Sequence, residues 1–352
     1  MSWEDYSAEQ NKKNPFENHA CGFRQGKEYQ IIMEKTEIPV IDVIIPAYRP
    51  DDSFHKLIRL LLEQSVKPHH IYVLQTIEDG EQVLQPLDQR MSVHPVPKKE
   101  FDHGATRDYG AGLAVKDIGD NISQHYILFM TQDAVPAGTE LLERLVKPFG
   151  DDRTAITYAR QLAREEADLL ERLTRVHNYP PEDQVKSKED LERLGIKTYF
   201  CSDVCAMYRL DRYMEQGGFV HPTIFNEDMI MASRMIQAGY QVVYCGSAEV
   251  YHSHNYSCMQ QFHRNFDLGV SQKQYREVFE SISSEKEGAG YAKSTLLYLL
   301  KRGKPGKAFY FALQCGFKLI GYKLGKNYDH LPRKMVLWCT MTPGYVLFHQ
   351  DE

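Results

Sequence analysis

The sequence predicts an α/β protein with a mostly parallel sheet, helices on both faces of that sheet, and a helical extension toward the C-terminal end. The first observation is that segments such as 40–47 (VIDVIIPA) and 126–130 (YILFM) are apolar at nearly every position. Strands that are covered by helices on both faces have this pattern. The second observation is that segments with helical periodicity alternate with these runs. A strand–helix–strand order implies a right-handed βαβ unit.

The first helix is predicted in the segment 51–65, where apolar residues recur at helical spacing. Its capping residue is Asp51, Asp52 or Ser53, since each of these side chains can accept a hydrogen bond from the first turn. The remaining predicted elements, in chain order, are a strand at 70–75, a helix at 105–116, the strand at 126–130, a helix at 139–149, strands at 154–160 and 199–210, a helix at 226–240, and strands at 241–245 and 248–254.

A charged insertion at 165–195 interrupts this alternation and is broken at Pro180 and Pro181. We interpret it as a solvated helical excursion in preference to a specific binding element. The domain organisation that follows is an N-terminal extension at 1–37, an α/β catalytic domain at 38–255, and a helical, basic, amphipathic region at 256–352.

Composition excludes several classes of protein. The 352 residues are 42% hydrophobic and 26% charged, which is typical of a globular protein. A net charge of −6 gives no basic footprint for nucleic acid. We expect no secretory signal and no membrane-spanning helix, because the first residues are polar and no apolar run is long enough. The seven cysteines are scattered, so reduced thiols, no zinc site and a cytoplasmic location are expected.

The segment from Gly288 to Thr340 carries ten Lys or Arg residues and one acidic residue, Asp329. Aromatic and aliphatic residues are interleaved with the basic ones. A basic amphipathic segment of this kind can lie on the anionic inner surface of a membrane. The alternative is a helical cap whose apolar face packs on the sheet.

Polar residues follow the predicted strands at the edge where ligands bind in open α/β sheets. Asp133 follows the run at 126–130, and it either caps the turn before Pro136 or holds a metal-bound diphosphate. His252 and His254 are two residues apart, so on a strand they point to the same face. They are either core residues or metal ligands.

Acidic and basic residues are predicted at the starts of two helices. In the segment 226–228 (NED) the asparagine can cap a helix and the acids favour its first turn, and spacing alone places this structural role ahead of a catalytic one. Arg107 lies in the first turn of a helix entered through Gly104, where a guanidinium suits a phosphate. The alternative is an exposed arginine paired with Asp102 or Asp108.

Five motifs occur in one order within residues 39–270: VIIPAYRP, FDHGATRD, FMTQDAVP, GGF followed by NEDM, and YHSH. In this order and spacing the sequence resembles glycosyltransferase family 2, and more narrowly its bacterial rhamnosyltransferase-type members. The resemblance implies a GT-A fold and inverting transfer of a sugar from a nucleoside diphosphate, with Mg²⁺ or Mn²⁺. The implied donor is dTDP-rhamnose or a UDP-sugar. The implied acceptor is a bacterial surface polysaccharide or a lipid-linked oligosaccharide.

Carried over by position, the resemblance also implies roles for individual residues. Nucleotide binding is expected of Pro46, Ala47, Tyr48, Arg49, Gln75, Arg107, Gln132 and Asp133. Contact with the donor or acceptor sugar is expected of His103, Gly217, Gly218 and Phe219. The metal ligands are expected to be Asp133, which matches the second aspartate of the family's Asp-x-Asp motif, with His252 and His254.

The expected catalytic base is Asp228, with Glu227 beside it. Single displacement requires a carboxylate that accepts the proton of the acceptor hydroxyl. A helix N-terminus stabilises the charge of a carboxylate and lowers its basicity, so burial or Glu227 has to offset this effect.

Two positions depart from the family pattern. Thr131 replaces the first aspartate of Asp-x-Asp, and Gln75 stands where an aspartate commonly contacts the nucleobase, unless Glu78 or Asp79 replaces it. These departures keep an inactive nucleotide-sugar-binding module as one alternative. A nucleotidyltransferase acting on sugar phosphates is the other, although the loop after the first strand lacks the glycine-rich sequence and lysine of that class.

Overall fold

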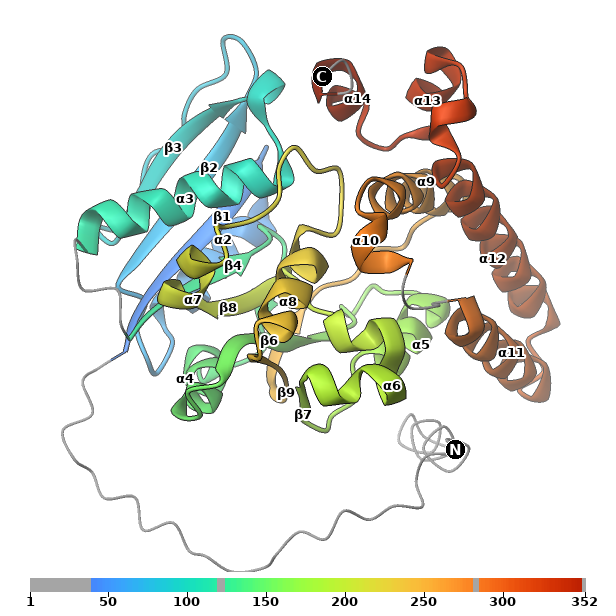
Figure 1. Ribbon diagram of the computed structural model, residues 1–352, viewed down its shortest axis with the longest axis horizontal. Helices are drawn as coiled ribbons and strands as arrows, with labels where there is room; N and C mark the ends of the chain where they lie inside the picture. The colour runs from blue at the N-terminus through green and yellow to red at the C-terminus, as the bar shows by residue number, and fades with distance from the viewer. Residues whose placement is uncertain (1–38, 119–123, 281–284, 350–352) are drawn as a thin grey trace, which may run out of the picture.

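The computed structural model describes residues 39–118, 124–280 and 285–349, so the extension predicted at 1–37 lies outside the described residues. Its centre is a nine-stranded sheet with the order β3-β2-β1-β4-β8-β6-β9-β5, in which β7 also pairs with β9 (Figure 1). The strands are β1 (Val40–Tyr48), β2 (His70–Ile77), β3 (Met91–Pro97), β4 (His125–Met130), β5 (Val135–Pro136), β6 (Thr154–Leu162), β7 (Gln184–Lys186), β8 (Cys205–Arg209) and β9 (Gln241–Tyr251).

Most strands of the sheet run in one direction. β1 is parallel to β2 and β4, β2 is parallel to β3, and β6 is parallel to β9. β8 is antiparallel to both β4 and β6. The block β3-β2-β1-β4 and the block β6-β9 therefore run in the same direction. The short strands β5 and β7 run against β9. The predicted mostly parallel α/β sheet is therefore confirmed, with the carboxyl ends of β4, β6 and β9 at one edge.

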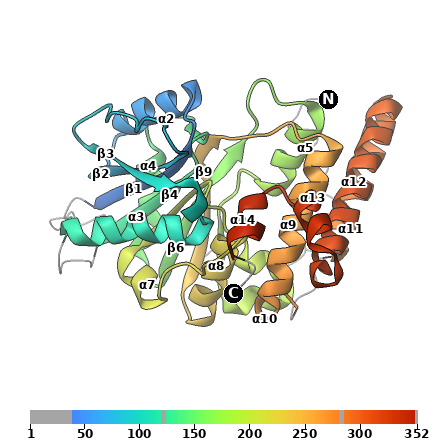
Figure 2. The same ribbon diagram turned by 90° about the horizontal axis from the view of Figure 1, so that it is seen from above.

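Helices cover both faces of the sheet, as predicted (Figure 2). α2 and α4 pack on one face, and α3, α7 and α8 pack on the other. The helices of this part are α2 (Asp52–Leu62), α3 (His103–Ile118), α4 (Leu141–Val146), α5 (Leu169–Asn178), α6 (Leu191–Leu194), α7 (Leu210–Glu215) and α8 (Glu227–Gln237).

Asp51 is the residue that caps α2. Its side chain accepts hydrogen bonds from the backbone amides of Ser53 (2.9 Å) and Phe54 (3.3 Å). Phe54, Leu57 and Leu61 are fully buried along one face of the helix. The cap and the helical spacing of these side chains together explain why a helix forms directly after β1.

The predicted C-terminal helical extension is confirmed, and it stands beside the sheet (Figure 1). Its helices are α9 (Cys258–Gln274), α10 (Arg276–Phe279), α11 (Glu285–Lys301), α12 (Pro305–Gly325), α13 (Arg333–Cys339) and α14 (Pro343–His349). α12 packs on α9, and its inner side also meets α11 and α5 in a second apolar cluster. Within the described residues, no helix combines the length and the apolarity that crossing a bilayer would require.

The close approach of α9 and α12 depends on glycines. A β-carbon at Gly321 would lie 2.3 Å from the carbonyl oxygen of Phe262, and one at Gly325 would lie 2.1 Å from that of Phe266. Real side chains do not tolerate such contacts, so the crossing of the two helices requires glycine at both positions.

Two strand predictions need correction. Only Cys205–Arg209 of the segment 199–210 is a strand, because residues 195–199 form a 3-10 helix and the next residues turn toward the pocket described below. The strands predicted at 241–245 and 248–254 are one strand, β9, with an irregularity where the register against β6 shifts. His252 and His254 lie beyond the end of this strand, not on it as predicted.

The insertion at 165–195 is not a solvated excursion. Leu170 and Leu173 of α5 are buried against the C-terminal helices, and β7 adds a strand to the sheet. α5 also lines the pocket described below. The strand β3 was not predicted, because its sequence MSVHPVP contains two prolines and pairs only at the edge of the sheet.

Candidate active site

A pocket of about 750 Å³ lies at the carboxyl ends of β4, β6 and β9. Its wall is formed by the loop after β4, the first turns of α3 and α8, the loop after β9, helix α5, and the C-terminal helices α9 and α12. Eight of the predicted site residues line it: His103, Arg107, Gln132, Asp133, Glu227, Asp228, His252 and His254.

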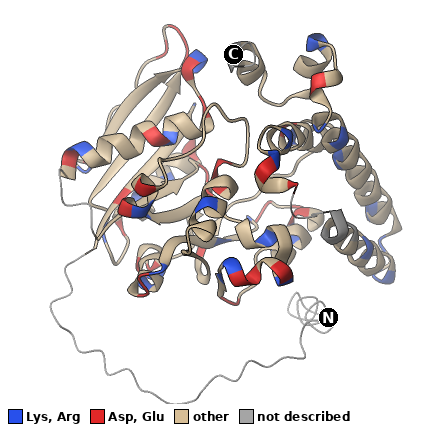
Figure 3. Ribbon diagram, viewed as in Figure 1, with Lys and Arg blue, Asp and Glu red and all other residues tan. Residues whose placement is uncertain are grey.

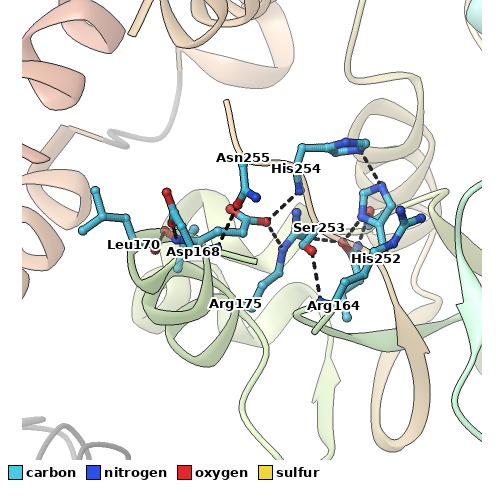
Figure 4. A network of polar contacts seen from close by, with 12 residues as sticks. Arg164, Asp168, Leu170, Arg175, His252, Ser253, His254 and Asn255 are labelled. Atoms are coloured by element: carbon cyan, nitrogen blue, oxygen red, sulfur yellow. Dashed lines mark hydrogen bonds and ion pairs between the residues drawn. The ribbon is translucent and has the colours of Figure 1, made fainter. Parts of the chain in front are cut away.

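Asp133, His252 and His254 converge at one end of this pocket. Oδ2 of Asp133 lies 3.5 Å from Nε2 of His252 and 3.3 Å from Nε2 of His254. The two Nε2 atoms are 3.1 Å apart, and the two rings are nearly perpendicular to one another (Figure 4). One ligand atom from each residue lies within 4.8 Å of the others. One carboxylate oxygen and two imidazole nitrogens at this spacing fit a single divalent cation.

Gln161 orients the imidazole of His252. Its Oε1 accepts a hydrogen bond from Nη1 of Arg175, which identifies this atom as the carbonyl oxygen. Oε1 also lies 2.9 Å from Nδ1 of His252. An acceptor at this distance places the ring proton on Nδ1, so Nε2 keeps its lone pair for a metal. Arg175 belongs to α5 (Figure 4), so the insertion supports the candidate metal site.

The side chain of Asp133 lies beside a cation, whereas the side chain of Thr131 makes no hydrogen bond with any described residue. Nη2 of Arg164 lies 3.7 Å from Oδ2 of Asp133 and also donates to the Asp133 carbonyl oxygen. The hydroxyl of Thr131 is buried and has no hydrogen-bond partner among the described residues. The candidate metal site therefore contains one carboxylate, and the threonine hydroxyl nearby is unused.

Glu227 and Asp228 begin α8, but Asn226 does not cap this helix. Asn226 has a left-handed backbone (φ 68°), and its side chain donates to Oγ of Ser271 at 3.0 Å. The capping role that spacing favoured is therefore wrong. The first turn of α8 is held instead by tertiary contacts with α9.

Arg107 forms a buried ion pair with Glu227. Its Nη1 lies 3.1 Å from Oε1 of Glu227, and its Nε lies 3.6 Å from Oδ2 of Asp203. The guanidinium is only 5% exposed. Arg107 is thus neither exposed nor paired with Asp102 or Asp108. Its positive charge offsets the charges of Glu227 and Asp203, the two acids next to Asp228.

Asp228 remains the acid in this group without an arginine partner. Oδ2 of Asp228 accepts from the amide of Asp203 at 3.2 Å, and Oδ1 accepts from the amide of Met229 at 2.7 Å. Burial, and then the charge of Glu227, raise the pKa of Asp228 to about 7, although both hydrogen bonds and Arg107 oppose this shift. Burial and Glu227 therefore offset the helix terminus, and the carboxylate can serve as a base near neutral pH.

Residues at the carboxyl ends of β1 and β2 form a second network, which Gln132 connects to the pocket. Backbone N and O of Tyr48 bond to the side chain of Gln132 at 2.8 and 3.0 Å. The Tyr48 hydroxyl donates to Glu78 at 2.6 Å, and Glu78 also pairs with Arg49 and Lys98. Hydrogen bonds from Lys98 and Tyr48 lower the pKa of Glu78 to about 2.

Several predicted residues do not line the pocket. They are Pro46, Ala47, Tyr48, Arg49, Gln75, Gly217, Gly218 and Phe219. The side chain of Gln75 bonds to the backbone of Leu84 and Gln82, at 2.7 and 3.2 Å, and so holds the loop after β2. Phe219 is buried in an aromatic cluster with Phe129 and Tyr213.

Most of the residues that line the pocket escaped prediction, and seven of them bear on its chemistry. They are Gln161, Arg164, Glu171, Arg175, Asp203, Arg264 and Lys318. Three of them lie in or next to the insertion that we interpreted as solvated, and two lie in the C-terminal helices. Of the seven, Gln161 and Asp203 stand next to the end of a strand, where a polar residue could have been recognised as part of a site.

Comparison with known proteins matches residues 42–215 to the family model described as glycosyl transferase family 2. The chain is 36% identical over 314 residues to the O-antigen chain rhamnosyltransferase RfbN of Salmonella typhimurium (strain LT2), covering 87% of this chain and 95% of that protein. It is 34% identical over 319 residues to the O-antigen chain rhamnosyltransferase WbaN of Salmonella anatum, covering 88% and 96%.

Solved structures show weaker similarity. The mannosyltransferase PcManGT from Pyrobaculum calidifontis, in complex with GDP-Man and Mn²⁺, aligns with a TM-score of 0.49 and 13% identity, over 90% of this chain and 89% of that one. Residues 1–349 of S. aureus TarS, in complex with UDP-GlcNAc, align with a TM-score of 0.44 and 10% identity, over 83% and 91%.

Proposed function

Because this chain belongs to glycosyltransferase family 2, we propose that it transfers rhamnose from a nucleoside-diphosphate donor to a hydroxyl of a growing bacterial surface polysaccharide or lipid-linked oligosaccharide. Its family makes it a glycosyltransferase. The choice of rhamnose rests on the two relatives named above. The observation that carries the proposal is that one pocket contains both the group Asp133–His252–His254 and the carboxylate of Asp228.

The residues of this pocket match the needs of a single displacement. The acceptor oxygen forms a bond to the anomeric carbon of the donor, the bond from that carbon to the diphosphate oxygen breaks, and its electron pair leaves with the diphosphate. Asp228 accepts the proton of the acceptor hydroxyl, and the configuration inverts. A divalent cation, when bound by Asp133, His252 and His254, supplies positive charge for the leaving diphosphate.

We favour Mn²⁺ over Mg²⁺ as the cation. Mg²⁺ prefers oxygen ligands in a strict octahedron, whereas two of the three ligand atoms here are imidazole nitrogens. Mn²⁺ is the weakest binder of the first-row transition series, yet as a transition-metal ion it accepts imidazole nitrogen more readily than Mg²⁺ does. For the donor we favour dTDP-rhamnose, with UDP-sugars as the alternative.

A transfer assay tests the function. The purified full chain is incubated with Mn²⁺, a lipid-linked acceptor, and either dTDP-rhamnose or a UDP-sugar, and the product is analysed by mass spectrometry. We expect transfer of rhamnose, loss of transfer with a chelator, and a drop of roughly 10²–10⁴-fold in kcat for Asp228→Asn. Tight binding of the nucleotide sugar without transfer would favour an inactive binding module. Release of inorganic diphosphate from a sugar phosphate and a nucleoside triphosphate would favour a nucleotidyltransferase.

We also propose that the C-terminal helices contact the inner surface of the membrane. Supporting this are apolar side chains that point into solvent, among them Phe309 (69% exposed), Trp338 (61%) and Ile320 (55%). Phe309, Leu313 and Ile320 recur at helical spacing on the outer side of α12. α12 carries Lys307, Lys318 and Lys323 and no acidic residue (Figure 3).

Flotation with liposomes tests the membrane contact. We expect the chain to float with vesicles that contain anionic lipid, and Phe309→Ser/Ile320→Ser to remain in solution. Val185→Ser is the control, because Val185 is 52% exposed on β7, outside these helices. Equal flotation of all three proteins, or none with any vesicle, would refute the proposed contact.

A further inference from the structure

Two cations of the pocket wall come from the C-terminal helices and lack acidic partners. Arg264 of α9 and Lys318 of α12 both line the pocket. Neither forms an ion pair with any carboxylate in the described part of the chain. The other arginines of the pocket differ in this respect, since Arg107, Arg164 and Arg175 each pair with an acid.

Arg264 is nevertheless fixed in place. Its guanidinium carbon lies 4.7 Å from the ring centre of Phe225 and 5.7 Å from that of Tyr256. The ring of Tyr256 stacks on His254 at 5.1 Å, and Phe225 lies directly before the segment 226–228. Arg264 is therefore held between the loop of the candidate metal ligands and the loop of the candidate base.

Lys318 is directed toward the same place by its helix. Gln314 lies one turn before Lys318 on α12, and its side chain donates to the carbonyl oxygen of Tyr256 at 3.0 Å. Residues four apart share one face of a helix, so Lys318 faces the Tyr256 loop as well. Burial lowers the pKa of Lys318, the charges of Cys315 and Glu171 raise it, and the charge of Arg264 lowers it. The charges of Lys318 and Arg264 therefore interact at the wall of the pocket.

Neither cation has an ion-pair partner among the described residues, so an anion bound between them would stabilise both charges. A guanidinium offers paired donors to phosphate oxygens, and an ammonium adds a point charge. We propose that Arg264 and Lys318 form a diphosphate-binding pair, supplied by the C-terminal helices, on the wall of the pocket opposite the sheet. The inference rests on the proposed function, because that reaction presents a diphosphate to this pocket.

The diphosphate has two possible sources, the nucleotide donor and a lipid-linked acceptor. The contacts of Arg264 with the Tyr256 loop favour the donor, since this loop also carries His254. In that position the pair stabilises the charge that develops as the sugar–oxygen bond breaks. It would also compensate for a metal site that has Thr131 in place of a second carboxylate.

Binding of inorganic diphosphate to the full chain is the direct test. Isothermal titration with Mn²⁺ present compares the wild type with Arg264→Gln, Lys318→Met and Arg264→Lys. We expect the dissociation constant to rise at least ~10-fold in the first two variants, because charge-assisted hydrogen bonds are lost, and to recover in part in Arg264→Lys. Arg59→Gln on α2 is the matched control, an exposed arginine away from the pocket. Thermal melting establishes that each variant is folded.

A second measurement distinguishes the sources. If the donor supplies the diphosphate, binding of dTDP weakens in the variants while binding of thymidine does not. If the acceptor supplies it, the KM rises for the diphosphate-linked acceptor and not for the same glycan without diphosphate. Unchanged binding of inorganic diphosphate in Arg264→Gln and Lys318→Met would overturn the inference. Wild-type protein that binds diphosphate yet transfers no sugar would instead refute the proposed function.

Discussion

Arg107 and Glu227 form an ion pair of 3.1 Å between the first turns of α3 and α8, and both side chains are less than a tenth exposed. The pair joins two helices that pack on the same face of the sheet. It also leaves Asp228, the next residue, without a cation of its own. The two members of the pair act on the candidate base in opposite directions, because Glu227 raises the pKa of Asp228 and Arg107 lowers it.

Arg107→Met should lower the free energy of unfolding by about 3 kcal/mol, because it leaves Glu227 buried without a partner. Urea unfolding followed by circular dichroism measures this loss. The double variant Arg107→Met/Glu227→Gln should recover part of it, since the unpaired charge is removed. Additive losses from the two single variants would show that the pair contributes no coupling.

The pH–rate profile of sugar transfer should have an acidic limb set by the ionisation of Asp228. Its pKa is raised to about 7, and only the ionised form accepts a proton, so kcat/KM should fall as the pH drops below this value. The groups that face Asp228 are Glu227, which raises its pKa, and Arg107 with the amides of Asp203 and Met229, which lower it. Glu227→Gln should therefore move the limb to lower pH. A pH–rate profile without an acidic limb between pH 5 and 8, or an unmoved limb in Glu227→Gln, would contradict the assignment.

Gln161→Leu should weaken Mn²⁺ binding by roughly 10–100-fold, because His252 loses the acceptor that fixes its tautomer. Titration of the metal, followed by calorimetry or electron paramagnetic resonance of free Mn²⁺, measures the change. Gln161→Glu keeps an acceptor oxygen at this place and should retain most of the affinity. Equal affinity in the leucine variant would exclude a supporting role for Gln161.

Gly321→Ala should destabilise the protein by about 1–3 kcal/mol, since its methyl group would lie 2.3 Å from the carbonyl oxygen of Phe262. Gly316→Ala, on the same helix, is the matched control. A methyl group there meets nothing within 4 Å, and alanine favours a helix. We therefore expect Gly316→Ala to be neutral or stabilising in thermal melting. Similar melting temperatures for the two variants would mean that the crossing of α9 and α12 can relax.

Local patterns in the sequence were enough to predict the central strands of the sheet and part of the site. The apolar runs of β1 and β4 read as buried strands because most residues there are buried, whichever face of the sheet they point to. Asp133 was identifiable because it follows such a run directly. The convergence of Asp133 with His252 and His254 was also predicted, although the histidines lie beyond β9 and not on it.

Other features had no local signal. Asn226–Glu227–Asp228 reads as an ordinary helix start, and only the burial of Asp228 in the folded chain, beside Glu227, raises its pKa. The insertion at 165–195 is charged, yet α5 turns Arg175 toward Gln161 and buries Leu173. Charge along a segment does not indicate which of its faces is covered.

The sequence by itself thus determined the α/β class, the helical extension and the candidate metal ligands, because these depend on periodicity and on residues next to strand ends. Only the tertiary structure decided how Asp228 is tuned, what orients His252, and that Arg264 and Lys318 reach the pocket from α9 and α12. The physical reason is that pKa values and ligand orientation depend on burial and on charges contributed by residues far apart in the chain.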